Sequence, residues 1–135
     1  MQGIDIRPLK MRLRGEIKAW RRALEPSWKA AADEKICARV LALREYAACS
    51  TLLTYVSLPI EVDTLRLISH AFADGKKVAA PRCVEGTHEM EFYEISSMDD
   101  LARQTFGVLE PVRERCRRLT DFSGSVCLVP ALAYD

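Results

Sequence analysis

The sequence has no long hydrophobic run and no obvious export signal. No apolar stretch approaches the ~20 residues that a membrane helix requires. The first residues, MQGIDIRPLK, lack the apolar core of a secretory signal. We therefore expect a cytoplasmic protein with no membrane partner.

Metal-binding and redox motifs are also missing. The five cysteines are widely separated and form no C-x-x-C pair; they are Cys37, Cys49, Cys83, Cys116 and Cys127. This spacing predicts reduced thiols that pack as small hydrophobic residues, not a zinc or redox site. The only two histidines, His70 and His88, indicate no Ser-His-Asp or Cys-His nucleophile.

The composition that remains is that of a globular protein. With 135 residues, 49% of them hydrophobic and 29% charged, the chain is expected to form a single domain over residues 1–135. The net charge is +1, but the first thirty residues hold eight Lys or Arg against three Asp or Glu, or +5, which leaves −4 for the remainder. The N-terminal segment is therefore expected to contact an anionic ligand or partner.

Two helices are predicted at the start of the chain. Pro8 and Pro26 bracket the first, which runs to about Leu24. Its apolar residues recur every three or four positions, which predicts one buried face: Leu13, Ile17, Trp20 and Leu24. A basic stripe borders this face: Lys10, Arg14, Lys18, Arg21 and Arg22. The second helix is expected from Ser27, as its cap, to about Leu43.

Strands and helices alternate after that point. Strands are predicted at 51–56, 77–80, 90–95 and 126–129, with helices near 64–74 and 97–103 and a surface loop at 114–120. This order predicts an α/β fold, an open three-layer sheet with helices on both faces. Ligands of such sheets collect at the carboxyl ends of the strands. These ends carry 57–61, Arg82 and 130–135, which suit an anionic ligand with a bound metal or are ordinary solvated loops.

Six short motifs in order resemble the 5-formyltetrahydrofolate cyclo-ligase family, also called methenyltetrahydrofolate synthetase. They are K-x-x-L-R at 10–14, Y-V-S-x-x-x-E-V-D-T at 55–64, G-K-K-V-A-A-P-R at 75–82, M-E-F at 90–92, G-V-L-E-P at 107–111 and L-V-P-A-L-A-Y-D at 128–135. Each motif is weak alone, but together they cover the chain from Lys10 onward.

The resemblance implies an ATP-dependent closure of 5-formyltetrahydrofolate to 5,10-methenyltetrahydrofolate, with Mg²⁺ and with release of ADP and phosphate. ATP phosphorylates the formyl oxygen, the N10 amine attacks the activated carbon, and phosphate leaves. Phosphoryl transfer of this kind needs positioning and charge neutralisation more than acids or bases. The resemblance therefore implies that few side chains need act as acids or bases, and the catalytic residues stay unassigned.

The family's site residues can be transferred only where the motifs match. Lys10 and Arg14 match its ATP-binding basic pair, and their i, i+4 spacing places both cations on one helical face. Val56 and Glu61 match its folate-contacting positions, where a carboxylate can accept paired hydrogen bonds from the pterin edge. The other cations of the stripe match nothing and are expected to be solvated.

In the family, the segment equivalent to ALAYD is followed by an arginine- and glycine-rich segment ending G-Y-Y-D, with a magnesium-binding aspartate. The sequence stops at Asp135 before that motif, so Asp135 receives no metal role and the metal ligands stay unassigned. We expect the C-terminal part of the fold to be missing, little or no turnover by these 135 residues alone, and self-association through an exposed sheet edge.

Two other functions fit the sequence less well. One is a catalytically inactive folate- or nucleotide-binding fragment or relative. The other is a nucleic-acid partner for the basic first helix, which we disfavour because no stacking aromatics are interleaved with its cations.

Overall fold

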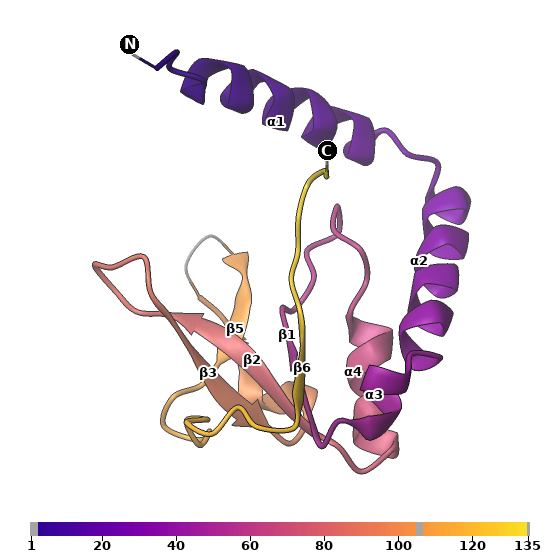
Figure 1. Cartoon of the computed structure of the whole chain (residues 1–135), viewed down its shortest axis with the longest axis vertical. Helices are drawn as coiled ribbons and strands as arrows, with labels where there is room; N and C mark the ends of the chain where they lie inside the picture. The colour runs from indigo at the N-terminus through magenta and orange to yellow at the C-terminus, as the bar shows by residue number, and fades with distance from the viewer. Residues whose placement is uncertain (1–2, 105–106, 135) are drawn as a thin grey trace.

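Four strands form the centre of the molecule, and the first two helices extend beyond it (Figure 1). The computed structural model describes residues 3–104 and 107–134. Its helices are α1 (Arg7–Arg22), α2 (Pro26–Leu41), α3 (Arg44–Ala48), α4 (Leu65–Ala73) and the 3₁₀ turn η1 (Met98–Asp100). Its strands are β1 (Thr51–Thr54), β2 (Lys77–Cys83), β3 (Met90–Ile95), β4 (Leu101–Arg103), β5 (Leu109–Pro111) and β6 (Ser125–Leu128).

The main sheet has the order β3-β2-β1-β6. Strand β1 pairs in parallel with β2 and β6, whereas β2 pairs antiparallel with β3. The predicted open α/β sheet flanked by helices is thereby confirmed. Because β1, β2 and β6 are parallel, their carboxyl ends lie at the same edge of the sheet. The loop that follows each of these strands therefore begins at that edge.

One face of the sheet carries the larger core. Leu52 and Val78 pack there against Ile68 of α4, and all three side chains are at most 1% exposed. The opposite face is covered by the segment before β6, where Leu119 packs on Leu53. A residue in the predicted loop at 114–120 therefore contributes to a core. Gly124 takes φ 69° just before β6, and a Cβ at that position would lie 2.9 Å from Ser50 Oγ.

The region after η1 differs from the prediction. The capping box of Ser97 and Asp100 forms as expected, but the turn ends at Asp100 and 101–103 is strand β4, not helix. Leu101 is 9% exposed in the core, and β4 pairs antiparallel with β5. An extended backbone directs Leu101 into the core while β4 and β5 satisfy each other's backbone groups. The short helix α3, which holds buried Tyr46, was not predicted.

The two N-terminal helices form where expected, with two corrections. The cap of α2 is Glu25, whose carboxylate accepts hydrogen bonds from the backbone N–H groups of Ser27 and Trp28. Pro26 takes the first helical position because it has no N–H to satisfy, so the helix begins before Ser27. The predicted burial of one face of α1 is wrong: no residue of α1 is buried, and Trp20 is 59% exposed.

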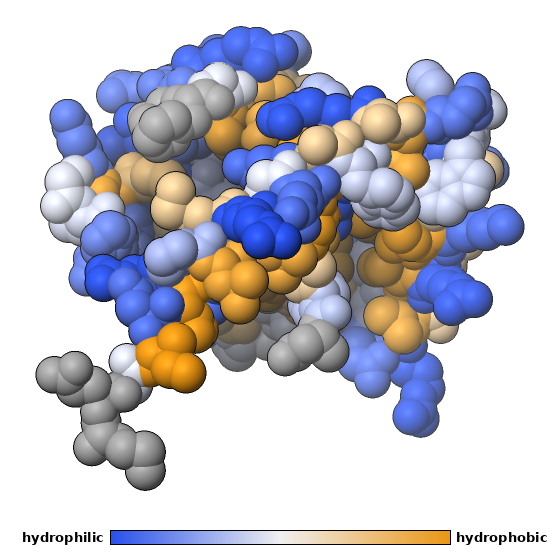
Figure 2. Space-filling model, turned by 90° about the horizontal axis from the view of Figure 1, so that it is seen from above, coloured by the Kyte–Doolittle hydropathy of each residue, from blue (hydrophilic) through white to orange (hydrophobic). Residues whose placement is uncertain are grey.

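The position of α1 explains this exposure. The helix runs across the carboxyl end of the sheet, above the loop after β1 and the segment after β6, and does not lie on a sheet face (Figure 1). Seen from above, hydrophobic areas lie open between the hydrophilic side chains of this end of the molecule (Figure 2). None of the described helices is long and apolar enough to cross a membrane.

Candidate functional site: two pockets that share Glu61

Several pockets lie at the carboxyl edge of the sheet, and two of them together contain the predicted site residues; the loop after β1 contributes to both. The first, the β1-loop pocket, has a volume of about 520 Å³ and lies between that loop, α2 and the β4–β5 hairpin. The second, the α1 pocket, has a volume of about 490 Å³ and lies between α1 and the segment after β6. Glu61 lines both of them.

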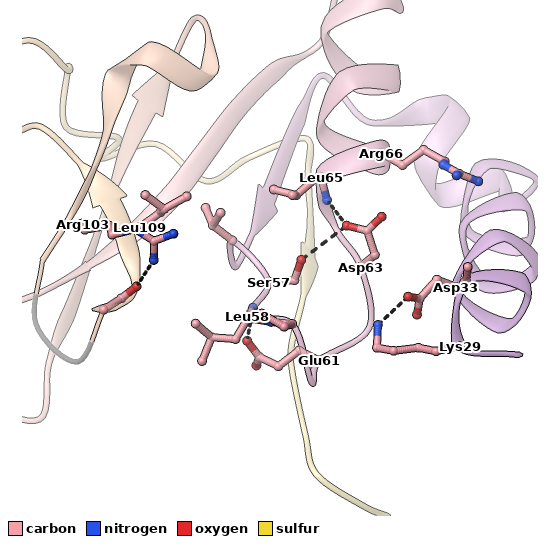
Figure 3. Close-up of a pocket in the computed structure, with 14 residues that line it drawn as sticks. Lys29, Asp33, Ser57, Leu58, Glu61, Asp63, Leu65, Arg66, Arg103 and Leu109 are labelled. Carbon is pink, nitrogen blue, oxygen red and sulfur yellow. Dashed lines mark hydrogen bonds and ion pairs between the residues drawn. The ribbon is translucent and has the colours of Figure 1, made fainter. Parts of the chain in front are cut away.

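A tight turn fixes the position of Glu61. The backbone N–H of Leu58 donates to Glu61 Oε1 at 2.8 Å, and the backbone N–H of Glu61 donates to the Leu58 carbonyl at 3.0 Å (Figure 3). The Ser-Leu-Pro sequence at 57–59 favours such a turn after a strand. One carboxylate oxygen is thereby occupied, while Oε2 has capacity to accept further hydrogen bonds.

The residues around this turn are fixed by buried hydrogen bonds. Thr64, 1% exposed, accepts the N–H of Ser57 at 3.0 Å and donates to the Tyr55 carbonyl at 2.8 Å. Asp63 accepts the N–H of Leu65 at the start of α4 at 2.9 Å. The turn that carries Glu61 is therefore attached to both β1 and α4.

The β1-loop pocket contains both predicted folate residues. Val56 is 4% exposed and belongs to the core, so it can offer a ligand only part of the pocket wall. Lys29 and Asp33 add an ion pair of 2.6 Å whose side chains are 24% and 15% exposed. This pair was not predicted, although its i, i+4 spacing on a helix is a recognisable signal.

The cations at the rim of this pocket are directed elsewhere. The Arg66 side chain extends toward α2, where its nearest acid is Glu34 at 4.0 Å (Figure 3). Arg103 donates to the Gly107 carbonyl at 3.1 Å. Arg82, at the end of β2, donates to the Pro111 carbonyl at 2.9 Å and lines neither pocket.

The α1 pocket contains both predicted ATP-binding residues. Lys10 and Arg14 are exposed, one turn apart, and face a wall made by residues 130–133. Leu13 and Ile17 supply apolar surface between the cations. An anionic ligand with a flat apolar part matches this combination.

Arg21 was predicted to be solvated, and the structure contradicts this. Its guanidinium donates to three backbone carbonyls, those of Ile60, Ala131 and Leu132, at 3.1, 3.0 and 2.7 Å. No pattern in the sequence separates it from its neighbour Arg22, which is exposed. The partners of Arg21 are carbonyls, which every residue carries, so the sequence holds no complementary signal for them.

Tyr55 lies close to Glu61, and the two residues line a further pocket between the loop after β1 and the segment after β6. The Tyr55 hydroxyl donates to the Val62 carbonyl at 3.0 Å. Burial, and secondarily the Glu61 carboxylate, raise the pKa of Tyr55 to about 12. The phenol therefore stays protonated at neutral pH and acts as a hydrogen-bond donor.

The described residues do not form a complete metal site. Within 3–104 and 107–134, no three His, Cys, Asp or Glu side chains lie close enough together to hold an ion. Asp135, to which we gave no metal role, lies outside the described residues.

Comparison with known proteins identifies the family. The chain is 34% identical over 103 residues to a probable 5-formyltetrahydrofolate cyclo-ligase of Schizosaccharomyces pombe, a match that covers 74% of this chain and 50% of the relative. It is 28% identical over 138 aligned positions to the mitochondrial 5-formyltetrahydrofolate cyclo-ligase of Arabidopsis thaliana, covering 91% of this chain and 50% of that protein. The chain thus spans about half the length of the curated relatives it matches.

Solved structures share the fold. The solution structure of 5,10-methenyltetrahydrofolate synthetase from Aquifex aeolicus matches 94% of this chain and 63% of its own, with a TM-score of 0.80 at 24% identity. The Mycoplasma pneumoniae enzyme of the same name matches with a TM-score of 0.56 at 23% identity, over 65% of this chain and 54% of its own. The sequence model of the 5-formyltetrahydrofolate cyclo-ligase family matches residues 7–135. The chain therefore belongs to the 5-formyltetrahydrofolate cyclo-ligase family.

Proposed function

We propose that this chain supplies the nucleotide and folate sites of an enzyme that converts 5-formyltetrahydrofolate to 5,10-methenyltetrahydrofolate with ATP. Family membership supports this reaction. The observation that carries the assignment of sites is that Glu61 lines two pockets, one with an apolar wall and one with a pair of cations. A transfer between two ligands requires such adjacent sites.

In this proposal the α1 pocket binds the phosphates of ATP through Lys10 and Arg14. Two cations one helical turn apart can contact two phosphates at once and neutralise the charge that moves during phosphoryl transfer. ATP binds as its magnesium complex, and we assign no ligand for the metal to this chain because the described residues form no three-ligand cluster.

The β1-loop pocket binds the folate. The free Oε2 of Glu61 accepts hydrogen bonds from the amino-pyrimidine edge of the pterin, and Val56 contacts the ring. Since Glu61 also borders the α1 pocket, the pterin ring, which carries the formyl group on its N5 atom, lies next to the ATP phosphates. The chain contributes position and charge to the reaction, with no acid or base assigned.

Calorimetry with separate ligands tests the nucleotide site. Lys10→Gln combined with Arg14→Gln should weaken ATP binding roughly tenfold or more, because two charge-assisted contacts are lost. The matched control is Lys18→Gln with Arg22→Gln, which removes the same charge at the same spacing from the same helix. Equal losses in both double variants would show that only the general charge of α1 matters and would refute the site.

The folate site is tested by Glu61→Gln. Glutamine keeps an oxygen for the Leu58 N–H, so the turn is retained while the charge is removed. We expect about tenfold weaker binding of 5-formyltetrahydrofolate and little change for ATP. Glu85→Gln, in an exposed turn, is the control. Unchanged folate affinity in Glu61→Gln would contradict the assignment.

A second candidate is a binding module without turnover. The two pockets offer places for both ligands, and no catalytic acid or base is assigned among the residues that line them. We propose that residues 1–135 fold as one domain that binds both ligands but forms little or no product alone. Methenyltetrahydrofolate absorbs light at longer wavelength than its precursor, so turnover can be followed directly; rapid product formation would exclude the binding module. The predicted cytoplasmic location stays a prediction, since one relative is named as mitochondrial.

A further inference from the structure

The attachment of α1 depends on few contacts. None of its residues is buried, and Leu13 and Trp20 are 51% and 59% exposed. The helix therefore lacks the buried apolar face that normally fixes a helix to its domain. Yet α1 carries the two cations of the α1 pocket, so something else must fix their position relative to Glu61.

Arg21, in the last turn of α1, makes that attachment. Its Nη1 donates to the carbonyl of Ile60 at 3.1 Å, and its Nη2 donates to the carbonyls of Ala131 and Leu132 at 3.0 and 2.7 Å. The first partner lies 39 positions away in the sequence and the others 110 and 111 positions away. One side chain thus joins α1, the loop after β1 and the segment after β6.

The three carbonyl groups that Arg21 binds lie next to residues of the two proposed binding sites. Ile60 directly precedes Glu61, and residues 131–132 form the wall that Lys10 and Arg14 face. A shift of α1 away from these carbonyls would move both cations relative to the carboxylate. The contacts of Arg21 therefore connect the segments that line the two pockets.

We propose that Arg21 is a positioning residue that sets the distance between the nucleotide and the folate, an inference that rests on the proposed function. The planar guanidinium directs several N–H groups in fixed directions, so it can bind carbonyls of two separate segments together. A lysine ammonium at the same position has the charge but places all its donors on one atom. Geometry as well as charge is therefore required.

The measurable consequence is coupling between the two ligands. When α1 is held in place, a bound nucleotide lies against the folate pocket and changes its affinity. Without the attachment, each ligand binds independently. A merely structural role for Arg21 would lower thermal stability but leave the ratio of folate affinities, with and without nucleotide, unchanged.

The experiment uses the intact protein with three single variants. Calorimetry gives the affinity for 5-formyltetrahydrofolate with and without a non-hydrolysable ATP analogue. We expect the analogue to change folate affinity in the wild type, and Arg21→Gln to reduce that ratio by about tenfold. Arg21→Lys should not restore it. Arg22→Gln, the same charge change at the adjacent exposed residue, should behave as the wild type.

The possible results distinguish a failure of the proposed role of Arg21 from a failure of the proposed function. A wild type that binds both ligands, with an unchanged ratio in Arg21→Gln, overturns the role of Arg21 and leaves the proposed function intact. Full rescue by Arg21→Lys overturns the geometric argument. A wild type that binds neither ligand refutes the proposed function and the role of Arg21 with it.

Discussion

Removing the hydroxyl of Thr64 tests how the loop that carries Glu61 is held. Thr64 is 1% exposed and joins both ends of this loop through its side chain. It accepts the N–H of Ser57 at 3.0 Å and donates to the Tyr55 carbonyl at 2.8 Å. Thr64→Val preserves the shape of the side chain and deletes both hydrogen bonds.

The expected magnitude follows from what each partner retains. The Tyr55 carbonyl still accepts the hydroxyl of Thr54 at 2.9 Å, so it keeps a partner. The Ser57 N–H loses its acceptor, and one unsatisfied donor costs about 1–3 kcal/mol. We therefore expect Thr64→Val to lower the free energy of unfolding by about 2 kcal/mol.

The matched variant is Thr64→Ser, which keeps the hydroxyl and loses one buried methyl group. Its expected loss is about 1 kcal/mol. Urea unfolding followed by circular dichroism gives both values, and calorimetry adds the affinity for 5-formyltetrahydrofolate. We expect weaker folate binding only in Thr64→Val, since only that variant releases the loop. If Thr64→Val is as stable as the wild type, or less damaging than Thr64→Ser, the reasoning about this loop fails.

Two further predictions concern pH and association. The pKa of Tyr55 is raised by burial to about 12 from 10.0, so the stability it adds is complete below pH 10 and is lost as pH rises through about 12. The free energy of unfolding, measured across this pH range, should fall more steeply in the wild type than in Tyr55→Phe. Parallel curves for the two proteins would contradict the raised pKa of Tyr55. Strand β6 is an edge strand of the sheet, and Val129, the residue after it, is 71% exposed. We therefore expect the protein to self-associate through this edge as its concentration rises, and Val129→Lys to weaken that association. The control is Ile4→Lys, at an apolar residue that is 90% exposed, which should have no effect. Light scattering that shows only monomers at every concentration would exclude it.

Much of the local structure was predictable because its determinants are local. The proline-bounded helices, the apolar runs of β1 and β2 and the capping box at Ser97 each depend on residues a few positions apart. The positions of Lys10 and Glu61 came from the family motifs. The structure places the two residues on pockets that share a wall, which no single motif implies.

The errors have a common origin. Periodicity predicted that α1 is amphipathic, but it does not contain information about what lies against the apolar face. The capping box at Ser97 predicted a helix to about Arg103, yet Leu101 lies in strand β4 because its side chain reaches the core in an extended backbone. In both cases a distant segment decided the outcome.

By itself, the sequence determined the family, the alternation of helices and strands, and which residue types reach the carboxyl edge of the sheet. Which of the five cations in the basic stripe of α1 binds to distant backbone groups depends on how the chain folds. Arg21 is selected by carbonyl groups 39 and about 110 positions away, and carbonyls are the same in every residue. A side chain whose partners are backbone atoms can be identified only once the chain has folded.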